Sequence, residues 1–169
     1  ALFRKLQTLR DHPTAPLAGH LGVAVDLLSK LPAKLWWADD PASNDKALAP
    51  GIVAWLATDT LVVFDLGYFA FWLFDALTAA QTWFVTRMRE KASYTVQQVL
   101  VKRPQVRDQI IHLGIYKGNG QCQHPLRLVE VFVNGRWQRY LTNVLDPQRL
   151  SVVEVVALYD ARWSVETTF

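Results

Sequence analysis

Hydrophobic runs divide the N-terminal half of this chain into short elements separated by polar or proline-containing turns. Residues 21–29 and 33–37 are predicted to be neighbouring strands joined by a Ser-Lys-Leu-Pro turn. After a polar loop, a helix is predicted from Pro50, because proline suits the first turn of a helix. Residues 60–65 are continuously apolar and β-branched, which is typical of a central strand buried on both faces.

The next stretch predicts how that central strand is paired. Residues 69–80, after Gly67, have a helical pattern, and residues 82–88 form another apolar run of strand length. A strand, a helix and a second strand in succession normally place the two strands parallel. This part of the chain is therefore predicted to be an α/β domain.

Beyond residue 92 the pattern changes to antiparallel β structure. Asn134-Gly135 is the strongest short signal for a hairpin. The predicted strands are residues 110–116, 126–133 and 136–142. We therefore expect a β-rich insert, at roughly residues 93–146, between the α/β part and the final helix.

The final helix has a clear start. Ser151 and Glu154 form a capping box, in which each residue binds the backbone N–H of the other. From there an apolar stripe follows helical spacing: Val152, Val155, Val156, Tyr159 and Trp163. At about 100° per residue, Tyr159 and Glu166 lie about 20° apart and Arg162 about 60° away. These three side chains therefore project from one side of the helix.

The polar residues of this helix, and Asp65 at the end of the predicted strand 60–65, also have ordinary structural interpretations. Arg162 and Glu166 are spaced as a helix-surface ion pair, with Tyr159 at the edge of the core. Asp65 ends the buried strand, where open α/β sheets place their ligand groups. An aspartate at that position could instead simply cap a turn before Gly67.

Composition excludes several classes of protein. The chain has 169 residues, of which 51% are hydrophobic, enough to bury a core in one domain with an insertion. The single Cys122 excludes a disulfide framework, and four scattered histidines argue against a zinc site. The longest apolar run, residues 66–74, is too short to span a bilayer. We therefore expect a cytoplasmic protein that does not bind the membrane.

Charge is unevenly distributed along the chain. Residues 1–75 carry six Lys and Arg against eight Asp and Glu, residues 76–139 carry ten against three, and residues 140–169 carry two against four. A basic middle between acidic flanks suggests that a polyanion binds the middle, although a solvated basic surface would have the same composition. The phosphate contacts expected there are Arg87, Arg89, Lys91, Lys102, Arg103 and Arg107. Trp137 and Tyr140 could stack on an unpaired base or pack in the hairpin core.

Two blocks of sequence carry a family resemblance. The first begins "DLGYFAFWLFDALTAAQTWFVTRMREK" at Asp65, and the second is "YLTNVLDPQRLSVVEVVALYDARWSVETTF" at the C-terminal end. In residue type, spacing and order they resemble bacterial insertion-sequence transposases of the DDE class. The similar branch carries its last catalytic glutamate in a Tyr-x-x-Arg-x-x-x-Glu signature.

The resemblance implies a fold and a set of site residues. The fold would be ribonuclease-H-like, an α/β mixed sheet with flanking helices. Residues 1–92 would form part of its core, residues 93–146 the β-rich insertion, and residues 147–169 the catalytic-glutamate helix. Asp65 and Glu166 would be catalytic carboxylates that bind two Mg²⁺ or Mn²⁺ ions. Tyr159 and Arg162 would contact a DNA phosphate near the cut end.

The chain also departs from the family pattern. The first catalytic aspartate, followed by Gly and Ser or Thr, does not occur, and the signature's lysine would be residue 173. Asp26, on a predicted strand, is the alternative third ligand, whereas Asp39, Asp40 and Asp45 lie in a loop. We therefore expect an internal fragment that lacks the first strand and the first aspartate and is inactive alone.

The resemblance also implies the partners. They would be double-stranded DNA, as transposon ends and target, and a second copy of the protein in a synaptic complex at the bacterial nucleoid. A non-catalytic DNA-binding remnant of a transposase remains the alternative. A dimerising protein-interaction domain without nucleic acid is disfavoured by the segregation of charge.

Overall fold

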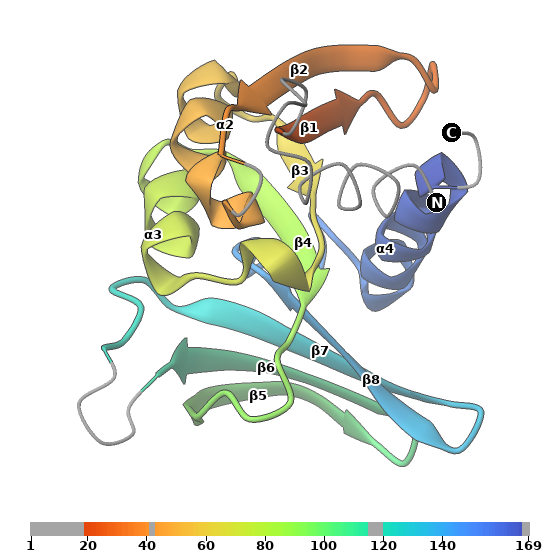
Figure 1. The fold of residues 1–169 in the computed structure, drawn as a ribbon. Helices are drawn as coiled ribbons and strands as arrows, with labels where there is room; N and C mark the ends of the chain where they lie inside the picture. Colours follow the sequence, from red (N-terminus) through yellow and green to blue (C-terminus); the bar gives the residue numbers. More distant parts are fainter. Residues whose placement is uncertain (1–18, 41–42, 115–119, 167–169) are drawn as a thin grey trace. The chain divides into compact units, whose positions relative to one another are not determined.

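The computed structural model describes residues 19–40, 43–114 and 120–166 (Figure 1), with side chains as far as Arg162. The chain divides into two compact units, Ala1–Ala54 and Trp55–Phe169, and each has a sheet of its own. In the described ranges no helix is long and apolar enough to cross a membrane.

The first unit contains a two-stranded antiparallel sheet. Strands β1 (His20–Val25) and β2 (Pro32–Ala38) pair with His20 opposite Ala38. A short 3-10 helix, η1 (Asp45–Ala47), is capped by the Asn44 side chain and leads into α2 (Ala49–Trp55). The two strands and the helix predicted for this region are confirmed, with the first strand ending earlier than expected.

The second unit is a six-stranded mixed sheet with helices. The strand order is β3-β4-β8-β7-β6-β5, in which β3 and β4 are parallel and every other pair is antiparallel. The strands are β3 (Leu61–Val63), β4 (Trp83–Arg87), β5 (Tyr94–Arg103), β6 (Val106–Leu113), β7 (Leu126–Val133) and β8 (Arg136–Thr142). The helices are η2 (Leu66–Tyr68), α3 (Phe71–Ala79) and α4 (Val152–Glu166). The predicted α/β class and the parallel pairing around α3 are confirmed.

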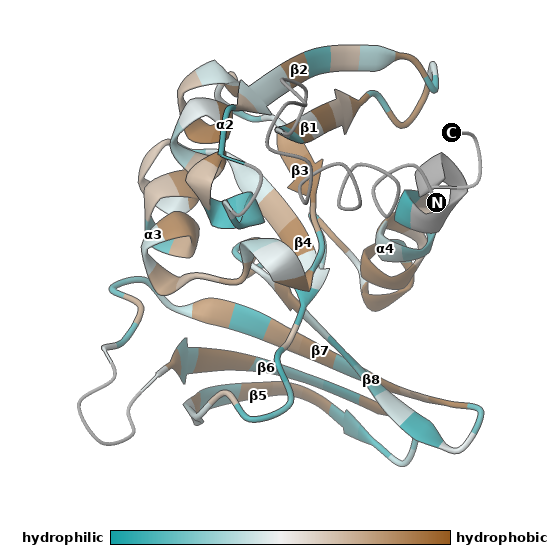
Figure 2. Ribbon diagram, in the orientation of Figure 1, coloured by the Kyte–Doolittle hydropathy of each residue, from teal (hydrophilic) through white to brown (hydrophobic). Residues whose placement is uncertain are grey.

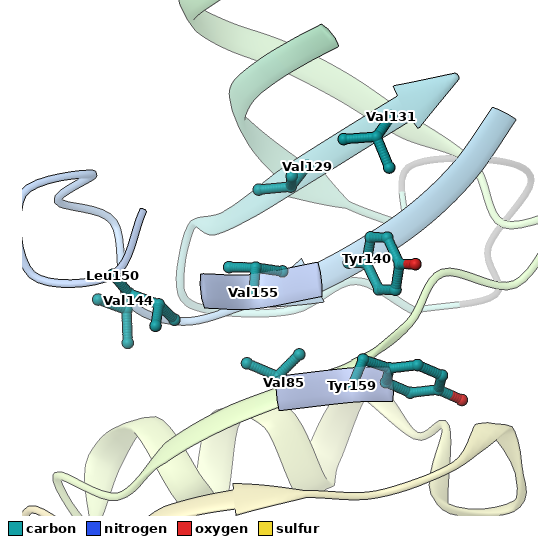
Figure 3. Close-up of a cluster of buried hydrophobic side chains, with 8 residues drawn as sticks. All are labelled: Val85, Val129, Val131, Tyr140, Val144, Leu150, Val155 and Tyr159. Carbon is teal, nitrogen blue, oxygen red and sulfur yellow. The ribbon is translucent and has the colours of Figure 1, made fainter. Parts of the chain in front are cut away.

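Alternating side chains of β4 serve two separate cores. Phe84 stacks on Phe74 of α3, with ring centroids 5.0 Å apart. Val85 points to the other face, where it packs with Val155 and Tyr159 of α4 (Figure 3). Helices α3 and α4 therefore cover opposite faces of the sheet, with β4 buried between them. The prediction that residues 60–65 form a central strand buried on both faces is wrong. Strand β3 has an apolar colouring in Figure 2, but it is only half-buried because it lies at the edge of the described sheet and pairs with β4 alone.

The β-rich region forms as predicted, but with one strand more than the sequence pattern indicated. Strand β5 was not recognised, because its apolar residues do not alternate regularly. Register shifts between Val96 and Gln98 and between Val99 and Val101 interrupt the period of two. The strand predicted at residues 110–116 is wrong in its limits, because β6 ends at Leu113 and Gly114 turns away with a φ of 83°.

Two local signals are confirmed in detail. Asn134 and Gly135 both adopt positive φ, 51° and 76°, as a tight turn between β7 and β8 requires. At the start of α4, the Glu154 carboxylate accepts hydrogen bonds from Ser151 N and Oγ, both at 2.7 Å. Glu154 N donates back to Ser151 Oγ at 3.3 Å. The capping box therefore fixes where α4 begins.

Candidate functional site

Asp65 lies directly after β3, where the chain leaves the sheet. Its Oδ1 accepts a hydrogen bond from Gly67 N at 2.8 Å, which caps η2. Its backbone carbonyl accepts a bond from Thr86 Oγ1 on β4 at 3.4 Å. The carboxylate is half-buried, and its Oδ2 accepts no hydrogen bond from the residues that the structure describes. Asp65 therefore caps a turn and still has one carboxylate oxygen available to a ligand.

Tyr159 of α4 packs on the face of the sheet to which Leu61 and Val63 of β3 also contribute. It is buried and packs edge-on against Tyr140 of β8, with ring centroids 5.5 Å apart (Figure 3). Burial raises the pKa of the Tyr159 hydroxyl above its ordinary value. The positive charge and the hydrogen bond of Arg162, and the positive charge of Arg87, act to lower this pKa, whereas the negative charge of Asp65 acts to raise it. Asp65, Arg87 and Arg162 are therefore all within electrostatic reach of one hydroxyl.

Two guanidinium groups lie against these tyrosines. Cζ of Arg87 is 5.7 Å from the ring centroids of both Tyr140 and Tyr159. Cζ of Arg162 is 5.3 Å from the Tyr159 ring centroid. Cation–π contact holds each guanidinium against a tyrosine ring, and a planar guanidinium has the donor geometry that suits an anion. We call Asp65, Arg87, Tyr140, Tyr159 and Arg162 the tyrosine cluster.

Arg87 has an unused donor in this cluster. Its Nε is buried and has no hydrogen-bond partner among the residues that the structure describes. A buried N–H without a partner is costly, so such a group is commonly completed by a ligand or an ordered water. Together with Arg162, Arg87 makes this end of β4 suited to bind an oxyanion.

Tyr140 is a buried core residue, and its burial affects the pKa of its hydroxyl. Burial raises the pKa of its hydroxyl, with Asp160 adding to the rise and Arg87 opposing it. Only 3% of Tyr140 is exposed, so of its two interpretations the structure favours packing in the core over stacking on a base. Its position against Arg87 was not predicted, because it depends on the pairing of two strands that are distant in sequence.

Glu166 is the last residue of α4, and its side chain lies outside the described part of the structure. The helix places its backbone seven residues beyond Tyr159, about 10 Å along the axis. The predicted ion pair between Arg162 and Glu166 also lies outside the described residues. Both remain predictions.

The basic residues expected to contact DNA occupy two places in the second unit. Arg89 and Lys91 are exposed just after β4, and Cζ of Arg89 lies 5.2 Å from the Phe69 ring centroid. Lys102 and Arg103 are exposed at the end of β5, where Lys102 pairs with Arg107 of β6. The second group therefore forms one basic corner at the β5–β6 turn.

Trp137 lies beside that basic corner. Its ring is 5.4 Å from Phe132, its direct partner across β7 and β8. Cζ of Arg107 lies 4.3 Å from the Trp137 ring centroid and Nη1 of Arg107 is 4.0 Å from Glu130. The structure thus gives Trp137 the cross-strand packing of a hairpin aromatic, in a half-buried position.

Asp26 is not on a strand, contrary to the sequence prediction. It follows β1, and its Oδ1 accepts bonds from Leu28 N, Ser29 N and Ser29 Oγ at 2.7–3.1 Å. The Ser29 hydrogen bonds, backbone first, lower the pKa of this carboxyl. Asp26 therefore has the geometry of a turn-capping residue.

The loop aspartates also have local partners. Asp39 Oδ1 accepts from Trp37 Nε1 at 2.9 Å, and Asp45 Oδ1 lies 3.0 Å from His20 Nε2. The backbone carbonyl of Asp40 accepts the N–H of Ser43. Among residues 19–40, 43–114 and 120–162, no three His, Cys, Asp or Glu side chains come together as a metal site.

Comparison with protein-family models identifies a match over most of the chain. Residues 18–169 match the family model described as "Transposase DDE domain". Among curated proteins, no sequence matches the chain.

Proposed function

This chain belongs to the transposase DDE domain family, and we propose that it serves the Mg²⁺-dependent cleavage and strand transfer of DNA in cut-and-paste transposition of an insertion sequence. The observation that carries this proposal is the tyrosine cluster, where Arg87 and Arg162 lie against Tyr159 and the charge of the Asp65 carboxylate raises the pKa of the Tyr159 hydroxyl. It combines anion-binding donors with a carboxylate, the two kinds of group that phosphodiester chemistry requires.

The fold supports the proposal of a ribonuclease-H-like catalytic core that carries a β-rich insertion. Asp65 lies two residues after β3, one strand of a parallel pair, and helices cover both faces of the sheet. This is the arrangement expected of a ribonuclease-H-like core. The antiparallel strands β5 to β8 correspond to the proposed insertion, which precedes the helix of the Tyr-x-x-Arg-x-x-x-Glu signature.

Transposase DDE domains generally use divalent metal ions, and Asp65 fits such an ion in donor type. Hard Mg²⁺ and Mn²⁺ prefer carboxylate oxygens, and Oδ2 of Asp65 accepts no hydrogen bond from the described residues. We propose that Asp65 and Glu166 hold the metal ions. Two such ions, when bound, activate the attacking oxygen and stabilise the leaving oxygen.

The chain's own residues would bind and orient the DNA. Arg87 and Arg162 would each donate hydrogen bonds to phosphate oxygens near the cut, because a planar guanidinium matches two oxygens at once. The Tyr159 hydroxyl, whose pKa burial raises further above the neutral range, would donate a further bond. The cation–π contacts hold both guanidiniums before DNA binds, so less entropy is lost on binding.

We further propose that the rest of the duplex follows the basic surface of the second unit. Trp137 would stack on an unpaired base. The phosphate contacts would be Arg89, Lys91, Lys102, Arg103 and Arg107. Such contacts to phosphates confer affinity without sequence preference. The functional assembly would be a homodimer that brings two transposon ends together.

A second function is a DNA-binding remnant without catalysis. It is favoured by the local partners of the other carboxylates considered as ligands, because Asp26, Asp39 and Asp45 already bind Ser29, Trp37 and His20. Such a remnant would retain the basic surface and the two arginines and would bind DNA without cutting it.

The two functions are separated by Asp65→Asn in a complete transposase that includes residues 1–169. Asparagine keeps the acceptor for Gly67 N but removes the anionic ligand, so folding and DNA binding should be retained. Nicking of supercoiled plasmid in Mg²⁺ should fall to background. Asp59→Asn is the matched control, since Asp59 is exposed and its Oδ1 accepts a hydrogen bond from the uncharged Trp83 Nε1.

Glu166→Gln should behave like Asp65→Asn. Near-normal nicking by a folded Asp65→Asn variant would remove Asp65 from the catalytic set. If the unmodified protein binds plasmid but never nicks it in Mg²⁺ or Mn²⁺, the remnant function is correct.

A further inference from the structure

A fully buried ion pair joins two strands of the second unit. Nε and Nη2 of Arg127 on β7 donate to Oδ1 and Oδ2 of Asp108 on β6, at 2.8 and 2.7 Å. Both side chains are 0% exposed. They lie at the face of the sheet that α4 covers, because Asp108 pairs with Val129 of the α4-side core.

Arg127 also reaches the segment that leads into α4. Its Nη1 donates to the carbonyl of Leu150 at 2.6 Å and lies 3.5 Å from the carbonyl of Val144. Leu150 immediately precedes Ser151, the first residue of the capping box. One side chain therefore ties the sheet to the point where α4 begins.

The other end of this segment is held as well. Asn143 is buried, its Oδ1 accepts from Phe84 N at 2.9 Å, and its Nδ2 donates to the carbonyl of Thr82 at 2.9 Å. Residues 143–150 are thus fixed to β4 at one end and to Arg127 at the other. The start of α4 has little freedom to shift along the sheet.

Stability alone does not require an ion pair at this place. A buried ion pair loses its hydration on folding, and replacing it with apolar residues of similar volume is often neutral for stability. What an apolar pair cannot supply is a directed hydrogen bond to one carbonyl. The guanidinium does so, because its planar fork satisfies Asp108 on one side and Leu150 on the other.

A shift at the start of α4 would be transmitted along the helix. Val155 and Tyr159, one turn apart, pack in a core with Val85 and Tyr140 (Figure 3). The Tyr159 ring contacts the Arg87 guanidinium, so this contact depends on how α4 packs against the core. A helix moves as a rigid rod, so displacement of Ser151 displaces Tyr159 and Arg162 by a similar distance.

We infer that Arg127 and Asp108 are positioning residues, which fix α4 so that Tyr159 packs against Arg87, and Arg162 against Tyr159, in the tyrosine cluster. This inference rests on the proposed function for its effect on catalysis. It makes residues of β6 and β7, remote from the cluster, determinants of cleavage rate and not of DNA affinity.

The test is the double variant Asp108→Val/Arg127→Met, which replaces the pair with apolar side chains. The matched control is Glu130→Leu/Arg139→Met, which removes an ion pair with an N–O distance of 3.0 Å from the opposite face of the same sheet. Both are made in the complete transposase labelled with fluorotyrosine. The Tyr159 resonance is identified by its loss in Tyr159→Phe.

We expect the Asp108→Val/Arg127→Met variant to fold and to bind DNA within about twofold of the unmodified protein. Its Tyr159 resonance should shift, and amide exchange at the start of α4 should accelerate. Cleavage at saturating DNA should fall by about 10²-fold, the usual consequence of displacing a reacting group by about 1 Å. The control should retain the Tyr159 resonance and the cleavage rate.

An unchanged Tyr159 resonance and unchanged exchange in the Asp108→Val/Arg127→Met variant would overturn the inference. If that variant fails to fold, Arg127→Lys decides, because one ammonium cannot satisfy both Asp108 oxygens and Leu150. A folded Arg127→Lys protein with a shifted resonance supports positioning, and one with an unshifted resonance overturns it. Absence of cleavage in the unmodified protein contradicts the proposed function but leaves the resonance and exchange measurements decisive for positioning.

Discussion

Arg87 on β4 and Tyr140 on β8 pair directly across two antiparallel strands, and the Arg87 guanidinium carbon lies 5.7 Å from the Tyr140 ring centroid. This relationship joins the α/β core to the β-rich region at the position where the tyrosine cluster forms. The cluster therefore depends on both parts of the second unit.

Arg87→Ala should weaken DNA binding and make its salt dependence shallower by about one counterion, because one phosphate contact is lost. Fluorescence anisotropy at several salt concentrations measures this slope. Arg149→Ala is the control, since Arg149 also lies over an aromatic ring, 4.7 Å from the centroid of Trp83, but is not a proposed DNA contact. Equal slopes for Arg87→Ala and the unmodified protein would contradict phosphate binding by Arg87.

Arg162→Ala separates the two interpretations of the signature arginine. If Arg162 binds a phosphate, binding to transposon ends should weaken and the salt slope should fall by about one. A helix-surface ion pair would instead give an unchanged slope together with a small loss of thermal stability. Anisotropy and thermal unfolding on the same preparation distinguish these outcomes.

Alkaline pH should destabilise the second unit through Tyr159. Its pKa is raised above the ordinary value of 10.0, mainly by burial, so the folded state retains a proton that the unfolded state loses. The free energy of unfolding is therefore unaffected by this group below about pH 10 and falls as the pH rises further. Urea unfolding between pH 8 and 11 should show a weaker pH dependence in Tyr159→Phe, and an identical dependence would contradict this prediction.

Removing one partner of the buried ion pair should be far more harmful than removing both. Arg127→Ala leaves the Asp108 carboxylate buried without its cation, which should lower the free energy of unfolding by about 3–5 kcal/mol. Arg139→Ala, at the partly exposed pair with Glu130, should cost about 1 kcal/mol or less. Urea denaturation measures both, and similar losses would show that burial does not distinguish the two pairs.

The capping box can be tested independently of DNA. Ser151→Ala removes the acceptor for Glu154 N and should lower the free energy of unfolding by about 0.5–2 kcal/mol. Ser151→Asp supplies another capping acceptor and should restore most of the loss. A Ser151→Ala protein as stable as the unmodified one would mean that tertiary packing alone sets the start of α4.

Features with local sequence signals were predictable. The capping box at Ser151, the Asn134-Gly135 turn and the existence of strand β3 each depend on a few adjacent residues. The apolar run of β3 did not reveal that this strand lies at the edge of the described sheet. Asp26 was misassigned because Leu27 and Leu28 extend the apolar pattern, whereas the Asp26 side chain binds Ser29 and forms a turn. Local hydrogen bonding by a short polar side chain prevailed over hydrophobic pattern there.

Features that depend on distant pairing were not predictable. Two bulges removed the alternation that would have revealed β5. Arg127 lies in an apolar strand, and nothing in its neighbours indicates Asp108 as its partner across β6 and β7. The candidate site was predicted through Asp65, Tyr159, Arg162 and Arg87 individually, but the contact of Arg87 with Tyr140 follows from strand register alone.

The order of strands in the second unit also governs when the sheet can form during synthesis. Strand β4 ends at Arg87, but its neighbour β8 is made only about 50 residues later, after β5, β6 and β7. Until then β4 exposes an unpaired edge to the chaperones and to other nascent chains on the polysome. The β7–β8 hairpin, with its tight local turn, can assemble first and then close onto β4. Folding of the α/β core is thereby delayed until translation has passed through the last strand of the β-rich region.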